Sequence, residues 1–369
     1  MWQFHRVMKT TETLKEHDFK PKYEALLRGL LGRVPFVKVK SFGHIAEAFG
    51  NQPDWLVEVK AGERPWVLAV ESKRHGQPRE VRNGLLELRQ FLDQTKGKSC
   101  YGVLVAPFLS EESARLCTEA GIGYADLAGN AQLAFDQVFI QTHATDNPFR
   151  EKRETRSLFA PRATRVLRVL LQGPLRPWKV TELAESARVS LGWVSAVRQQ
   201  LLAREWAEAK PKGLSVSKPA ALLTAWAAAD RWEDRTEVQE YSSLVTNTEQ
   251  LAERVETLLK GKPHAFTQWF AGWLRHPYTA PPAITVYVTE FPNDFAVRDS
   301  LLARPVLGAS AVRFVVPKDD GVLYPSQTQR GFPLVSDVQI YLDLLRAGQR
   351  GEEQAAELRK WPDFAGGWG

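Results

Sequence analysis

The chain has few cysteines and no long apolar run, and both absences narrow the classes of protein to consider. Its 369 residues include two cysteines, Cys100 and Cys117, which provide neither a disulfide framework nor a Cys-x-x-Cys metal pair. No apolar stretch approaches the ~18 residues that a membrane span needs. The charged N-terminal residues lack the apolar core of a signal peptide. We therefore expect a cytoplasmic protein with no membrane partner.

Motifs of several common enzyme classes are also missing. The seven histidines are scattered without metal-ligand spacing, and the sequence contains neither a glycine-rich phosphate loop nor a nucleophile triad. A hydrophobic fraction of 44% and a charged fraction of 25% are ordinary for a folded protein. The length is sufficient for two or three domains, each with its own core.

A β-hairpin is predicted between residues 55 and 73. Two strand-like runs, Trp55 to Lys60 and Trp66 to Lys73, flank Gly62-Glu63, a loop that suits a type II′ turn. Pro65 lacks an N–H and is the point at which the pairing could shift. Without such a shift, the loop fixes the register and gives one buried, apolar face with the facing pairs Trp55–Val70, Val57–Leu68 and Val59–Trp66.

The same register brings two acids and an amine together. It places Asp54 opposite Glu71, with Cβ atoms roughly 5 Å apart. Lys73 projects from the same side of the sheet as Glu71. Oxygen ligands of this kind suit Mg²⁺ or Mn²⁺, which neutralises charge on a phosphate and lowers the pKa of bound water. We expect a divalent metal site here, with Lys73 orienting the water or stabilising the phosphorane.

Pro53-Asp54, followed after an interval by Glu71-Ser72-Lys73, resembles the motif of the PD-(D/E)XK nuclease superfamily. The resemblance implies Mg²⁺-dependent phosphodiester cleavage with Asp54, Glu71 and the Ser72 carbonyl as metal ligands. It implies that Lys73 is the catalytic base or a stabiliser. The alternative is coincidence, because Glu58-Val59-Lys60 repeats the Glu-x-Lys pattern. Such folds also persist without chemistry.

The elements around the hairpin are those of a restriction-endonuclease-like α/β/α sandwich over residues 1–148. The resemblance to PD-(D/E)XK nucleases also implies that Glu24 and Gln90 could lie near the metal, and a solvated surface position is the alternative for Glu24. The predicted helices cover residues 20–33, 79–96 and 110–121, and the predicted strands cover residues 35–42, 101–108, 123–127 and 131–140.

Two longer phrases, VLVAPFLSEESARLCTEAGIGYADLAGNAQL and SDVQIYLDLLRAGQRGEEQAAELRK, resemble proteins grouped with the AbiEi antitoxins of type IV toxin–antitoxin systems. The resemblance implies a DNA-binding transcriptional regulator whose C-terminal domain meets a partner, such as a cognate toxin protein. Asp126 and Asn130 lie in the first phrase. We expect them to satisfy turn amides, with a catalytic role as the alternative.

A basic domain is predicted after a polar linker at residues 146–160. Between Thr155 and Lys218, twelve Lys or Arg and four Glu give a local charge of +8, which leaves −2 for the rest of the chain. Helices over 161–172, 179–187 and 191–203, followed by a strand pair within 206–216, have the spacing of a winged helix-turn-helix domain. We assign it to residues 155–218.

The third of these helices is predicted to contact double-stranded DNA. Val194, Val197 and Leu201 face inward. Outward-facing Ser and Gln side chains can read base edges, and Arg can take phosphate or guanine. Wing lysines should contact phosphates and govern the salt dependence of binding. The candidate DNA-binding residues are the N-cap Ser190, then Trp193, Ser195, Arg198 and Gln199, and Lys210 and Lys212 of the wing. The alternative is that this domain contacts only proteins.

Residues 219–369 are predicted to form a C-terminal α+β domain with a partner-binding or regulatory role. Ser336 has capping-box spacing and should begin a helix. Other helices are predicted over 219–232, 246–259 and 352–360, and strands at ITVYV, VRFVV and VLYPS.

Together these features predict a multidomain, cytoplasmic, prokaryotic DNA-binding protein. Its winged helix would target a PD-(D/E)XK-type, Mg²⁺-dependent nuclease-like domain to DNA. The alternative is a non-catalytic transcriptional regulator or antitoxin with a degenerate nuclease fold and no cofactor. A purely structural adaptor is a third reading, and the oligomeric state stays open.

Overall fold

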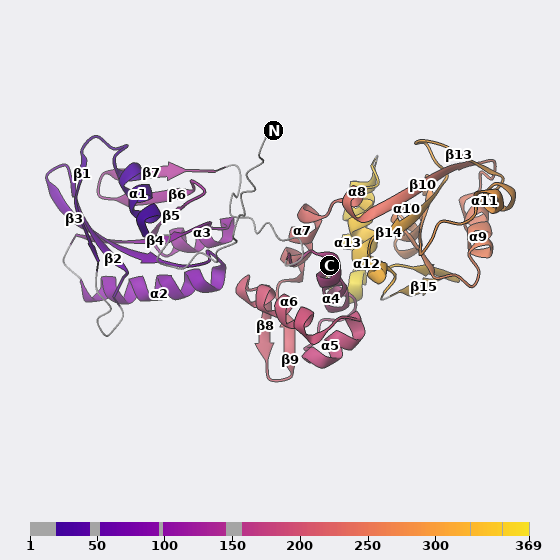
Figure 1. The fold of residues 1–369 in the computed structure, drawn as a ribbon, viewed down its shortest axis with the longest axis horizontal. Coiled ribbons are helices and arrows are strands. Elements are labelled where there is room, and N and C mark those ends of the chain that lie inside the picture. The colour runs from indigo at the N-terminus through magenta and orange to yellow at the C-terminus, as the bar shows by residue number, and fades with distance from the viewer. Residues whose placement is uncertain are drawn as a thin grey trace, which may run out of the picture. The chain divides into compact units, whose positions relative to one another are not determined.

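The computed structural model describes residues 20–44, 52–95, 99–144, 157–324, 326–348 and 350–368. The chain forms two compact units, Met1–Arg150 and Glu151–Gly369 (Figure 1). The protein is therefore multidomain and of mixed α/β class. Most of the predicted linker at residues 146–160 lies outside the described residues. In the described ranges, no helix combines the length and the apolar character that crossing a membrane requires.

A seven-stranded sheet forms the centre of the first unit, and its strands follow one another in chain order. The β3–β4 and β4–β5 pairs are parallel, and the other neighbouring pairs are antiparallel. The strands are β1 (Val37–His44), β2 (Trp55–Ala61), β3 (Arg64–Ser72), β4 (Cys100–Ala106), β5 (Gly123–Asp126), β6 (Ala131–Phe135) and β7 (Val138–Thr142).

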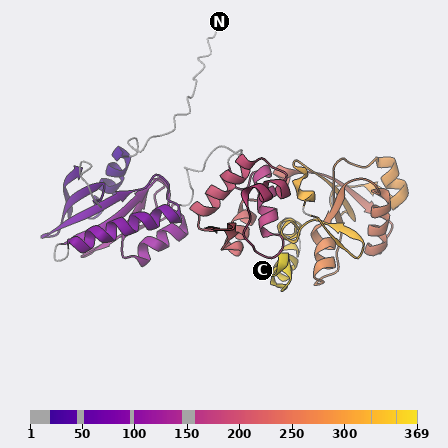
Figure 2. The same cartoon turned by 90° about the horizontal axis from the view of Figure 1, so that it is seen from below.

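Helices cover both faces of this sheet because its strands are apolar on both sides. On one face, α1 (Lys20–Leu31) packs through Leu27 against Val57 and its neighbours. On the other face, α2 (Pro78–Gln94) and α3 (Glu111–Glu119) pack around Leu104. Figure 2 shows α2 and α3 on the same side of the sheet. The unit thus has three layers: helix, sheet, helix.

The β2–β3 hairpin has the predicted register. Trp55 pairs with Val70, and the pairing continues without a shift to Ala61 and Arg64. Gly62 has a φ of 59°, which is the positive value that the first loop position of a type II′ turn requires. Pro65 pairs with Lys60 and does not disturb the ladder.

The predicted strand over residues 131–140 was wrong, because this segment is a second hairpin. It forms β6 and β7, which are antiparallel. Asp136 turns the chain between them with a φ of 51°. Asp is one of the few residues that adopt this left-handed conformation readily, and this explains how the polar residue inside an apolar run makes the turn.

The second unit begins with three helices and a two-stranded antiparallel sheet. They are α4 (Pro161–Leu171), α5 (Val180–Ala187), α6 (Leu191–Ala203), β8 (Ala207–Lys210) and β9 (Gly213–Val216). These bounds agree with the predicted helices and strand pair to within one or two residues. The chain leaves α4 at Gly173, with a φ of 91°, and leaves α5 at Arg188, with a φ of 53°.

A second seven-stranded sheet follows, in the order β13-β10-β14-β12-β11-β16-β15. Its strands are β10 (Thr236–Ser243), β11 (His264–Thr267), β12 (Ile284–Val288), β13 (Ala303–Pro305), β14 (Val312–Pro317), β15 (Gln327–Gln329) and β16 (Phe332–Leu334). Its helices are α7 (Pro219–Ala229), α8 (Trp232–Arg235), α9 (Thr248–Leu258), α10 (Gln268–Arg275), α11 (Asp294–Leu301), α12 (Asp337–Leu344) and α13 (Gly351–Lys360), with 3-10 turns η3 (Asp320–Leu323) and η4 (Phe364–Gly366).

Two local predictions in this region had different outcomes. Ser336 caps α12 as predicted, because its side chain accepts a hydrogen bond from the amide of Gln339. The strand predicted at VLYPS was wrong. Its first residues lie in η3, where the side chain of Asp319 accepts from the amide of Gly321 and so favours a helical turn over a strand.

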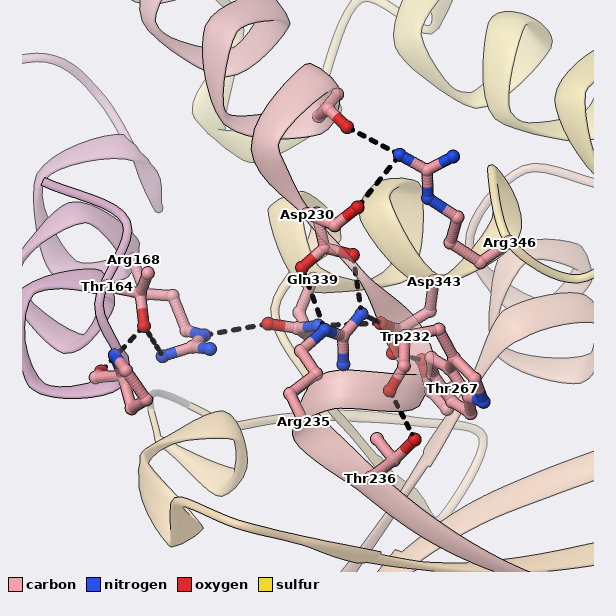
Figure 3. Close-up of polar contacts among 12 residues, drawn as sticks. Thr164, Arg168, Asp230, Trp232, Arg235, Thr236, Thr267, Gln339, Asp343 and Arg346 are labelled. Atoms are coloured by element: carbon pink, nitrogen blue, oxygen red, sulfur yellow. Dashed lines mark hydrogen bonds and ion pairs between the residues drawn. The ribbon is translucent and has the colours of Figure 1, made fainter. Parts of the chain in front are cut away.

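Helix α4 and the second sheet belong to one hydrophobic core. A buried polar network crosses it (Figure 3). Arg168 of α4 donates to Gln339 at 2.8 Å, and Gln339 donates to Asp343 at 2.7 Å. Asp343 also accepts from Arg235, at 2.7 Å. The separation of residues 155–218 and 219–369 into two domains therefore stays a prediction, because the structure joins both parts in one compact unit.

Candidate functional site

The candidate metal-binding residues lie together where β3 ends. Glu71 and Ser72 are the last two residues of that strand, and each is only 7% exposed. Lys73 follows directly, and Asp54 precedes β2 on the neighbouring chain segment. The hairpin register is the cause of this convergence, since it places the start of β2 beside the end of β3.

Ser72 holds the carboxylate of Asp54 in place. Its backbone N–H donates to Oδ2 of Asp54 at 2.7 Å, and its hydroxyl donates to the same oxygen at 2.5 Å. The sequence motif assigned Ser72 a role only through its carbonyl. The structure adds an orienting role for its amide and hydroxyl.

Lys73 lies between two carboxylates. Its Nζ donates to Oε1 of Glu71 at 2.8 Å and to Oε2 of Glu87 at 2.6 Å. Burial favours the neutral amine, but the hydrogen bonds and charges of the two acids outweigh burial and raise the pKa of Lys73 above its usual value. The ammonium is therefore charged at neutral pH.

Glu71 is in an unfavourable environment for a charge. Burial is the main cause that raises its pKa to about 8, and the nearby charge of Asp54 adds to this effect, while Lys73 opposes it. A cation bound between the two acids would relieve their repulsion.

The donor set fits Mg²⁺ or Mn²⁺ in part. Hard carboxylate oxygens are available from Asp54 and Glu71, and Mg²⁺ commonly binds through one or two carboxylates together with water and substrate phosphate. In the parts of the chain that the structure describes, no group of three or more His, Cys, Asp or Glu is arranged to enclose a metal. Water and substrate oxygens would therefore have to complete the coordination of a metal bound by Asp54 and Glu71.

Glu87 is a member of this cluster that sequence reasoning missed. It lies on α2, one turn before Gln90, the residue chosen from the motif, and its distance to Lys73 depends on how α2 rotates against β3. Glu24, the other residue considered, accepts from Arg28 at 2.8 Å in an exposed ion pair. Glu24 therefore has the surface position given as its alternative.

Asp126 is fully buried and supports a turn, as expected. Its Oδ1 accepts from the amides of Gly129 and Asn130 at 2.9 and 2.8 Å. Its Oδ2 accepts from the amide of Leu109 at 2.9 Å and from Nδ2 of Asn130 at 2.8 Å. All four bonds are internal, which is the arrangement expected of a structural residue.

Helix α6 has the predicted inward and outward faces. Val194, Val197 and Leu201 are buried. The candidate DNA-binding residues lie at the surface: Ser190, Ser195, Gln199, Lys210 and Lys212 are exposed, and Trp193 and Arg198 are partly buried. Ser190 occupies the N-cap position, but its side chain makes no capping hydrogen bond. The predicted N-cap position is therefore confirmed, and the residue is exposed.

A cleft of about 700 Å³ lies beside the start of α6. Ser190 and Trp193 line it together with Arg162 and Arg188. Sequence reasoning did not single out Arg162, which lies in the first turn of α4 and is distant in sequence from α6. Arg162 and Arg188 therefore add two guanidinium groups to the surface that the sequence predicts to contact DNA.

The local charge of +8 does not all reach the surface. Arg168 is buried against Gln339, and burial lowers its pKa to about 10. Arg165 is paired with Asp319 at 2.8 Å and Asp320 at 2.5 Å. These two arginines hold the second unit together and contribute little to an outside field.

No protein family and no curated protein matches this chain. Among solved structures, EndoMS in its apo form is similar to 32% of the chain, with 19% sequence identity and a TM-score of 0.21. The similar part spans 48% of the EndoMS chain, which is about half its length.

Proposed function

We propose that the first unit is a PD-(D/E)XK-type, Mg²⁺-dependent nuclease domain with a restriction-endonuclease-like fold. We propose that the second unit directs it to double-stranded DNA through a winged helix. The observation that carries the proposal is the convergence of Asp54, Glu71 and Lys73 at the end of β3.

The surrounding fold supports this assignment. The hairpin β2–β3 leads into parallel β4, and helices cover both faces, so the acids are held at the end of a rigid central strand. Asp54, Glu71 and the Ser72 carbonyl would hold the metal ion, which would neutralise phosphate charge and supply a nucleophilic water.

The structure favours one of the two roles for Lys73. A general base must accept a proton, whereas the two neighbouring acids keep the Lys73 ammonium charged. We therefore assign Lys73 to charge stabilisation on the phosphate. Such preorganised donors commonly contribute a factor of about 100 or more to the rate.

The proposed DNA contact rests on exposed and partly exposed surface groups of suitable chemistry. Ser195 and Gln199 are available for base edges, and Arg198 and Trp193 for the backbone or methyl groups. Lys210 and Lys212 lie exposed in the β8–β9 hairpin. In this proposal the domains are 1–148, 155–218 and 219–369, and the last has a partner-binding or regulatory role.

Nicking of supercoiled plasmid with Mg²⁺ or Mn²⁺ tests the proposal. Glu71→Gln and Lys73→Met should each lower nicking about 100-fold or more while DNA affinity stays within a factor of two. Glu24→Gln, which changes an acid in an exposed ion pair, is the matched control and should cut normally. Absence of cleavage by the wild-type protein on DNA and RNA would refute the enzymatic proposal.

A non-catalytic regulator or antitoxin is the second candidate. The observation in its favour is that Lys73 already occupies an oxygen of Glu71 that a metal would use. This candidate predicts a footprint on the protein's own promoter that weakens with Gln199→Ala, and a toxin encoded nearby. An isolated gene with no footprint would refute it.

A further inference from the structure

Helix α2 has a glycine in its interior, at the point where it crosses the candidate site. Gly84 is buried in the middle of the helix. Glycine weakens a helix interior relative to alanine, so this position calls for a packing reason. A Cβ added to Gly84 would lie 2.7 Å from Cε of Lys73 and 2.9 Å from Cδ1 of Leu104. The aliphatic part of Lys73 occupies the space that a side chain at position 84 would fill.

The next contact with Lys73 comes from the same face of α2. Glu87 follows Gly84 by three residues, a spacing that puts both on one side of a helix. Oε2 of Glu87 accepts from Nζ of Lys73 at 2.6 Å. The Glu87 side chain is 42% exposed and that of Lys73 is 18% exposed, so Glu87 closes the solvent side of the ammonium.

Glu87, the second carboxylate that contacts Lys73, would become more important for holding the ammonium once a cation is bound. Glu71 would then share its charge with the cation, and the Lys73 ammonium would lie beside a like charge. With Glu87 in place, the ammonium keeps an anionic partner that is not needed for the metal. Without Glu87, repulsion would favour rotation of Lys73 towards water.

We infer that Gly84 and Glu87 are positioning residues that fix the Lys73 ammonium beside the Asp54–Glu71 pair. The inference rests on the proposed nuclease function for its catalytic consequence. Gly84 permits the close approach of α2 to Lys73, and Glu87 determines where the ammonium points. Neither residue touches the substrate in this proposal.

The first experiment observes Lys73 directly and does not depend on cleavage. The ¹H–¹⁵N signal of the Lys73 ammonium, assigned through Lys73→Met, should be visible in the wild-type protein because the group is buried in an ion pair. Glu87→Gln should shift or broaden it, and Glu87→Asp should restore it in part. Glu24→Gln is the control. An unchanged Lys73 signal in Glu87→Gln would overturn the inference, whether or not the protein cuts DNA.

The second experiment is a double-mutant cycle on plasmid nicking. Gly84→Ala should lower kcat at least tenfold with little change in KM, and adding it to Lys73→Met should cause no further loss. Gly29→Ala is the matched control, because an added Cβ there meets no described atom within 4 Å. Losses that multiply in the double variant would overturn the inference, since they would show that Gly84 acts independently of Lys73.

The third measurement checks that the metal site itself survives. The thermal shift produced by Mn²⁺ should be similar in the wild-type protein and in Glu87→Gln, because Glu87 is not a metal ligand in this proposal. Loss of that shift would overturn the positioning role and assign Glu87 to the metal. A wild-type protein that shows the Lys73 signal and its dependence on Glu87, but no cleavage, would refute the nuclease proposal alone.

Discussion

Replacement of Asp126 by alanine separates a structural from a catalytic role for this residue. Four donors converge on its buried carboxylate, three of them backbone amides. The amide of Leu109 is in a fully buried environment, so its loss of a partner should cost about 1–3 kcal/mol. The other three donors are partly accessible to water, which can replace the carboxylate at lower cost.

We therefore expect Asp126→Ala to lower the free energy of unfolding of the first unit by roughly 3–5 kcal/mol. For a unit of this size, such a loss lowers Tm by on the order of 10 °C. Asp126→Asn should lose less, because its amide oxygen still accepts from one pair of donors while its NH₂ faces the other pair.

Differential scanning calorimetry on the full chain is the appropriate assay, since two compact units should give separable transitions. Only the transition of the first unit should move. Glu24→Gln, in an exposed ion pair, should leave it unchanged. A variant Asp126→Ala that keeps its stability to within about 1 kcal/mol but loses nicking would refute the structural reasoning and make Asp126 a catalytic residue.

Three further predictions follow from the ionised groups. Because the folded protein raises the pKa of Glu71 to about 8, it binds that proton more tightly than the unfolded chain. Without metal, the resulting stability is fully present below the ordinary pKa near 4.5 and is lost as pH rises to about 8. In chemical denaturation with EDTA, the free energy of unfolding of Glu71→Gln should rise relative to that of the wild type as pH increases across that range. A difference between the two proteins that does not change with pH would contradict this. The double variant Lys210→Ala/Lys212→Ala should reduce the slope of log K for DNA binding against log salt concentration by about 1–2, as measured by fluorescence anisotropy. An unchanged slope would show that the β8–β9 hairpin does not contact DNA. Asp343→Ala should lower the free energy of unfolding of the second unit by about 3–5 kcal/mol in calorimetry, because it leaves Arg235 partly unpaired, and a loss below 1 kcal/mol would show that the network is dispensable.

Local sequence signals determined much of the site. The Gly62-Glu63 loop fixed the register of the hairpin, and this register places Asp54 beside the end of β3, which carries Glu71 and Ser72. Helix ends were equally local, since Ser110 and Ser336 cap the helices predicted to follow them. These features depend on residues within one turn or one hairpin, where backbone hydrogen bonding leaves few alternatives.

Contacts between distant elements were not predictable in the same way. Gly84 and Glu87 act on Lys73 because of the rotation of α2 about its own axis, which a hydrophobic stripe defines only coarsely. Strands β10 and β13 are largely polar, and each is placed in the second sheet by a partner far along the chain: β10 pairs with β14, and β13 pairs with β10. Their sequences have no periodic apolar pattern from which these two strands could be predicted.

The buried Arg168 connects the first helix of the second unit to α12. A basic residue in the first helix of a winged helix would ordinarily be counted as part of the DNA-binding charge. Here it donates to Gln339, which is bonded in turn to Asp343 of α12. Movement of α4 away from α12 would break this bond and leave the buried guanidinium with the 3.4 Å bond to Oγ1 of Thr164 in its own helix, a change that costs about 1–3 kcal/mol. We therefore expect α4 and α12 to move together, so that a partner that displaced α12 would displace α4 with it.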